Sequence, residues 1–151
     1  MLACPAPHGT VTDMPARKPD PHGPANVADV GAALDRGEEP EQAALRSATR
    51  YLLQVLEAKA PGRSVEVRVP PVAAVQCVAG PRHTRGTPPN VIETDPLTWF
   101  RLATGRFGWA EGVHSGAVRA SGSRADLSAY LPLLGPGGGY RGVVPPGQQS
   151  K

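Results

Sequence analysis

The chain has few cysteines, few aromatic residues and no long apolar run, and each shortage excludes a class of protein. Cys4 and Cys77 are too few for a disulfide framework, which favours a reducing compartment. No window approaches the roughly 18 apolar residues of a membrane-spanning helix, and no charged and then apolar leader marks a signal peptide. We therefore expect a cytoplasmic protein without stable membrane insertion.

Concentrated positive charge and metal-ligand spacing are also missing. The net charge is +3, but the arginines are scattered among acidic residues, whereas a nucleic-acid binder usually gathers them on one face. The histidines have no partner three or four positions away, and the two cysteines are isolated. We therefore expect no nucleic-acid partner, no metal and no other cofactor.

Glycine and proline, in contrast, are plentiful, with 18 of each, and they gather at the two ends. Neither end has the apolar periodicity that would offset the entropy lost on ordering. We expect four segments, which are a disordered proline-rich leader (1–25), a short helix and linker (26–39), a folded domain (40–134) and a disordered Gly/Pro tail (135–151).

Periodicity within the middle of the chain predicts helices and strands. Residues 41–59 place their leucines on one helical face, and Asn26 can cap a shorter helix that ends near Gly37. Strict alternation predicts a strand at 65–69 with one buried face, and the nearly continuous apolar run 72–78 predicts a central strand covered on both faces.

The second half of the domain predicts another strand, three helices and a final strand. After a strand at 90–94, the pair Asp95-Pro96 is a typical helix start, and Gly105 ends that helix. A short helix at 109–115 and a strand at 117–121 follow, and Ser123 can cap a last helix reaching about residue 134. Tight turns between consecutive strands favour an α+β fold, in which helices cover one face of a small, mostly antiparallel sheet.

The order of these elements carries a family resemblance. DPLTWFRLATGRFGWAEGVHSGAVRASGSRADLSAYLPLL, which begins at Asp95, resembles the C-terminal half of the sterol carrier protein (SCP2-like) family. There an acid-capped helix ends in glycine and is followed by a short helix, a Ser-Gly turn, a strand, and then a glycine and a helix that packs its leucines. The stretch from Arg63 to Pro96 resembles a bacterial, actinobacterial branch of that family.

The resemblance implies a sheet covered by helices, with an apolar tunnel or groove between the layers and a lipid or other apolar small molecule as the ligand. It also implies a non-catalytic protein that binds or transports lipid, or a module appended to an enzyme. The residues expected to line the ligand site are Leu52, Leu56, Val75, Cys77, His83, Arg85, Trp99, Leu102, Trp109, Val113 and Leu131.

Each group among these residues has an ordinary structural explanation as well. The aromatic residues between 99 and 109 can form a ligand wall, but a small domain needs the same rings to fold. His83 and Arg85 can grip an acidic head group, or His83 can act as a general base, or the loop can simply bond its own backbone. A scaffold module without ligand, with a protein partner, and a small enzyme using this loop therefore remain the alternatives to a carrier.

Overall fold

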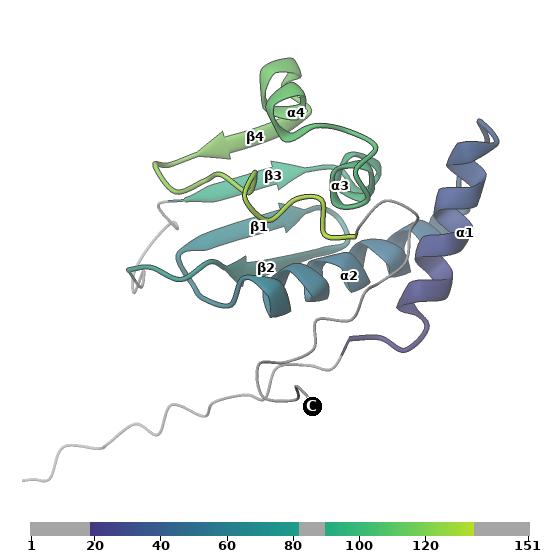
Figure 1. Cartoon of the computed structure of the whole chain (residues 1–151), viewed down its shortest axis with the longest axis horizontal. Helices are drawn as coiled ribbons and strands as arrows, with labels where there is room; N and C mark the ends of the chain where they lie inside the picture. The colour runs from purple at the N-terminus through teal and green to yellow at the C-terminus, as the bar shows by residue number, and fades with distance from the viewer. Residues whose placement is uncertain (1–18, 82–89, 135–151) are drawn as a thin grey trace, which may run out of the picture.

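The computed structural model describes residues 19–81 and 90–134, and it shows an open sheet with helices packed on it (Figure 1). In chain order the described elements are α1 (Gly23–Asp35), α2 (Gln42–Lys59), β1 (Val65–Val69), β2 (Ala73–Cys77), β3 (Val91–Thr94), α3 (Pro96–Ala103), α4 (Trp109–Ser115) and β4 (Val118–Ser121).

The four described strands are arranged in the order β2-β1-β3-β4. β1 pairs with β2 and β3 pairs with β4 in antiparallel fashion, while the central pair of β1 and β3 is parallel. The expected α+β class and mostly antiparallel sheet are confirmed, with one parallel pair in its middle. Val67 occupies the centre of the sheet, because it is matched with Val75 on one side and Ile92 on the other.

One face of the sheet is apolar and covered, and the other is polar and open. Burial alternates along β1 as the sequence predicts, with its three valines buried and the two charged residues between them only partly buried. α2 packs on the covered face beside the segment 122–134, which crosses in front of the sheet in Figure 1. The Lys59 ammonium on α2 donates to the Tyr130 carbonyl at 3.0 Å, which ties the two coverings together.

Acidic side chains cap the starts of α2 and α3. The Glu41 carboxylate accepts hydrogen bonds from the backbone N–H groups of residues 43 and 44 at the start of α2. Asp95 accepts from the Thr98 backbone N–H at 2.9 Å at the start of α3, where Pro96 occupies the first helical position. Gly116, with a φ of +81°, ends α4 in the left-handed conformation that glycine adopts most readily.

Two expectations, the start of α1 and the place of β2 in the sheet, were wrong. α1 begins at Gly23 rather than at Asn26, and Pro24 lies in its first turn. β2 is an edge strand rather than a central one, and its alternate residues Ala74 and Gln76 are exposed. Ala73, Val75 and Cys77 lie on the covered face of β2, so its apolar run reflects burial on one face with the small Ala74 on the open face, rather than burial on both faces.

The last predicted helix does not form, since residues 122–134 follow turns and extended backbone instead. The Asp126 carboxylate accepts from the Ser128 backbone N–H at 2.8 Å, which competes with helical bonding, and Pro132 lacks the donor that a helix would need there. Leu127 and Leu134 of this segment are still buried, and Leu131 and Leu133 pack against the core while remaining partly exposed. The hydrophobic pattern was therefore a correct guide to burial and a wrong one to backbone conformation.

Candidate functional site

Most of the predicted lining residues lie together in the apolar layer between the helices and the covered face of the sheet. Five of them belong to one buried cluster, with side chains at most 2% exposed, and three more pack against that cluster while remaining partly exposed. The buried five are Leu52, Leu56, Cys77, Trp99 and Leu102, and the partly exposed three are Val75, Trp109 and Leu131.

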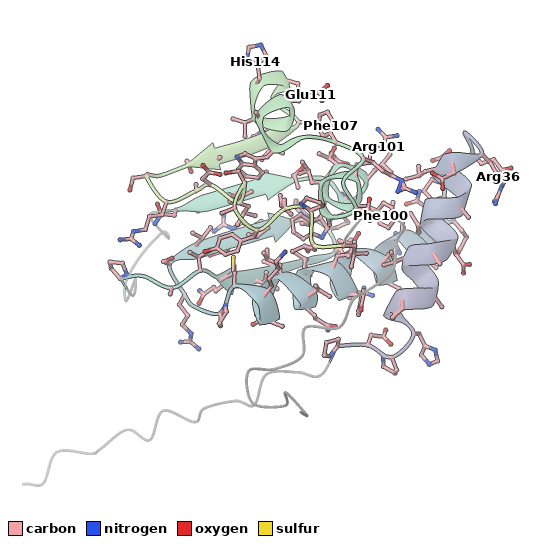
Figure 2. All side chains as sticks on the ribbon, viewed as in Figure 1. Arg36, Phe100, Arg101, Phe107, Glu111 and His114 are labelled. Atoms are coloured by element: carbon pink, nitrogen blue, oxygen red, sulfur yellow. The ribbon has the colours of Figure 1, made fainter. Side chains whose placement is uncertain are left out.

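The other three predicted residues are not placed in this layer. Val113 on α4 is 40% exposed and lies outside the buried cluster. His83 and Arg85 lie outside the described residues, so the head-group loop stays a prediction. Figure 2 shows His114, on the same helix as Val113, projecting away from the sheet.

Within residues 19–81 and 90–134, two buried polar side-chain atoms have no hydrogen-bond partner. They are the Thr49 hydroxyl on α2 and the Trp99 indole nitrogen on α3, and both residues are at most 1% exposed. A buried donor or acceptor without a partner carries a desolvation cost of about 1–3 kcal/mol, so such groups are rare in folded proteins. A bound molecule with a polar group could satisfy them.

Thr49 was missed by the sequence analysis, although a signal was present. It stands on the leucine-bearing face of α2, four residues after Leu45 and three before Leu52. A hydroxyl on an otherwise apolar stripe either bonds the preceding turn of its own helix or remains unpaired, and spacing alone does not distinguish these cases.

Cys77 is a buried apolar side chain rather than a reactive one. Its side chain is fully covered at the end of β2, and burial, followed by the nearby charge of Glu57, raises the pKa of its thiol from 9.0 to about 11. The thiolate is the nucleophilic form of cysteine, so this thiol is almost entirely in its unreactive form at neutral pH.

We expect the stability of the domain to fall between pH 9 and pH 11 because of Cys77. In that range the unfolded thiol ionises more readily than the folded thiol, which lowers the free energy of the unfolded state relative to the folded state by about 2 kcal/mol at pH 11. Urea unfolding of the wild type and of Cys77→Ala at pH 8 and pH 11 measures how much of the lost stability is due to Cys77.

In a Cys4→Ser background, Cys77 should also resist a thiol reagent at pH 8 until the domain unfolds. Rapid labelling of the folded protein would contradict the burial of Cys77.

The described part of the chain holds no group of three or more His, Cys, Asp or Glu side chains able to hold a metal ion. None of its helices combines the length and the apolar character that crossing a membrane requires.

Comparison with known proteins agrees with this geometry. The family described as bacterial SCP ortholog matches residues 41–133, which include every described element from α2 to β4. No curated protein matches the chain. The match spans well over half of the chain, and α1 lies before it. The chain therefore belongs to the bacterial sterol carrier protein-like family.

Proposed function

We propose that residues 40–134 form a non-catalytic, cytoplasmic carrier for a lipid or other apolar small molecule, held in the layer between α2, α3 and the sheet. The observation that carries this proposal is the pair of unpartnered polar atoms within an otherwise apolar layer, at Thr49 and Trp99. Family membership supports the same conclusion from the sequence, because sterol carrier-like proteins suggest a lipid ligand.

The chemistry of the two atoms limits what the ligand can be. An indole N–H only donates a hydrogen bond, so the ligand has to offer an acceptor oxygen to Trp99. A hydroxyl both donates and accepts, so Thr49 suits a hydroxyl, carbonyl or carboxyl group equally. Sterols and fatty acyl compounds carry such an oxygen-bearing group on an apolar body.

The described side chains also favour binding over catalysis. Burial holds the Cys77 thiol in its neutral form, and both histidines among the described residues are exposed, His22 just before α1 and His114 on α4. A nucleophile and a base within reach of each other would be needed for covalent catalysis, and Cys77 with these histidines does not supply that pair.

Thr49→Val should stabilise the ligand-free protein. Valine has nearly the same shape and removes a buried hydroxyl without a partner, so we expect the free energy of unfolding to rise by about 1 kcal/mol. The matched control is Thr98→Val, where the hydroxyl donates to Asp95 at 2.6 Å and its loss should lower stability by a similar amount. Urea unfolding of both delipidated variants checks the signs, and destabilisation by Thr49→Val would show that this hydroxyl has a partner.

Native mass spectrometry of the freshly purified full chain tests the function itself. We expect a lipid or acyl species near one-to-one stoichiometry, which denaturation and extraction would then identify. Trp99→Phe should retain less of it, because the phenyl ring cannot donate to the ligand oxygen. A ligand-free mass, together with no uptake of a pyrene-labelled fatty acid, would reject the carrier and favour an interaction module.

A further inference from the structure

A solvent-facing hollow lies at the end of the sheet where β1 begins and β2 ends. It has a volume of about 490 Å³, and none of its lining residues belongs to the core cluster. Figure 1 shows that the connection from α2 to β1, the end of β2 and the turn after β4 all lie at this end of the sheet. The residues that line the hollow are Gly62, Arg63, Ala79 and Gly80.

The backbone beside the hollow is strained. Val78 has a φ of +65°, a conformation that a β-branched residue rarely adopts. Both of its backbone polar groups are held in place, because its N–H donates to the Ala60 carbonyl at 2.7 Å and its carbonyl accepts from the Ser64 N–H at 3.1 Å. Strain of this kind gathers at binding sites, where the surrounding structure holds the backbone in one shape. The segment that leaves β2 is therefore fixed in position before any ligand binds.

The hollow also offers hydrogen-bond donors that the folded chain does not use. Among the described residues, the backbone N–H groups of all four lining residues form no hydrogen bond, and all four residues are exposed. Backbone N–H groups gathered in a concave site commonly bind anions. Two of the four residues are glycines, so no side chain shields their N–H groups from a ligand.

Two arginines border the hollow, and neither has an acidic partner within the described chain. Arg63 lines it, and Arg124 approaches it at Gly80, where an added Cβ would lie 2.5 Å from the Arg124 Nη1 atom. The ion pairs among the described residues are formed by other arginines. No aspartate or glutamate is among the lining residues, so both guanidinium groups keep their charge and their donors for a ligand.

We propose that this hollow binds a phosphate group, held by the Arg63 and Arg124 guanidinium groups together with the exposed backbone N–H groups. A phosphate monoester carries about two negative charges at neutral pH and three acceptor oxygens that point in different directions. Two unpaired cations and donors from separate segments of the chain match that charge and that shape. A carboxylate, in contrast, has one charge and two oxygens in a plane.

The phosphate can belong to a soluble phosphate ester or to a lipid head group, since both present the same oxygens. The site lies outside the apolar layer, so it does not depend on the carrier function proposed above.

Titration of the full chain with glycerol 3-phosphate, followed by NMR of the backbone amides, tests the assignment. We expect the amide signals of the four lining residues to shift together, because their N–H groups contact the ligand. Arg63→Gln and Arg124→Gln should each weaken binding by about 10-fold or more, since each removes a charge-assisted hydrogen bond. Arg101→Gln is the control with the same change in net charge and should alter nothing, because Figure 2 shows this exposed arginine of α3 well away from the hollow.

Gly80→Ala tests the contribution of the backbone without a change in charge. The added Cβ would crowd the Arg124 guanidinium and lie 2.9 Å from the Ser64 Cβ, so it should weaken glycerol 3-phosphate binding, while the melting temperature reports whether the domain is folded. Shifts confined to other amides, or binding that survives the Arg63→Gln/Arg124→Gln double variant, would overturn the site. Acetate that moves the same amides with equal affinity would overturn the choice of a phosphate group.

Flotation with phosphatidylcholine vesicles, prepared with and without phosphatidic acid, distinguishes the two sources of the phosphate. Binding that requires phosphatidic acid and is lost in the double variant would assign the site to a lipid head group. Glycerol 3-phosphate binding without vesicle binding would assign it to a soluble ester, and either result supports the site. The double variant should retain its co-purifying lipid in native mass spectrometry, so the hollow and the carrier function can fail separately.

Discussion

Val67→Asp is expected to unfold the domain. Val67 is fully buried at the centre of β1, where it faces the helices and is matched with Val75 and Ile92 on the two neighbouring strands. Burying a carboxylate there without a partner, or protonating it to avoid that, costs several kcal/mol. Since a domain of this kind has only about 5–15 kcal/mol of stability, most or all of it would be lost.

Circular dichroism at 25 °C and a thermal scan measure this effect, and we expect no cooperative transition for Val67→Asp. Glu66→Gln, one residue earlier on the same strand, is the control. Its side chain lies on the open face and pairs with Arg68, a partly exposed contact worth at most about 1 kcal/mol. A folded Val67→Asp variant would mean that the covered face of β1 is wrongly assigned.

Gly62→Ala should be the second most damaging of these changes. Gly62 lies between α2 and β1 with a φ of +149°, and an added Cβ would come within 2.1 Å of the Val78 backbone oxygen. That oxygen already accepts from the backbone and the hydroxyl of Ser64, so moving it would disturb the connection between the end of β2 and the start of β1. Backbone strain at the positive φ adds to the clash, so we expect the free energy of unfolding to fall by about 3 kcal/mol or more.

Gly37→Ala is the matched control for that substitution. Gly37 also has a positive φ, +71°, but a Cβ there would meet nothing within 4 Å. Only the conformational cost remains, about 1–2 kcal/mol. Urea unfolding of both variants compares them directly, and equal losses would show that the close approach at Val78 relaxes without penalty.

Local patterns in the sequence were sufficient for the elements that a single stretch of chain determines. The leucine stripe of α2, the alternation of β1 and the Asp95-Pro96 start of α3 each depend on neighbouring residues, and each prediction was confirmed. The order of the elements carried the resemblance to the sterol carrier protein family, and the match to the bacterial SCP family supports that resemblance.

The position of β2 within the sheet and the pairing of individual polar groups could not be predicted from local sequence patterns. The run 72–78 does not encode whether its strand has one neighbour or two, since that depends on β3 returning beside β1. At the candidate site, the layer was predicted from apolar residues, but the unpartnered Thr49 hydroxyl was not, because pairing is decided by three-dimensional contacts. The placement of Arg106 against Gly31 joins residues 75 positions apart, which no local pattern reports.

The open face of the sheet has a consequence for how a lipid carrier could meet a bilayer. Arg68 and Glu66 pair on β1, and Arg119 and Glu93 approach within 3.7 Å across β4 and β3. These two cations and two anions cancel, so the described strand residues give this face no excess positive charge. An anionic membrane surface attracts clustered lysines and arginines, and this face offers it no net charge. Electrostatic attraction would therefore not bring the protein to a membrane with the sheet facing the lipid.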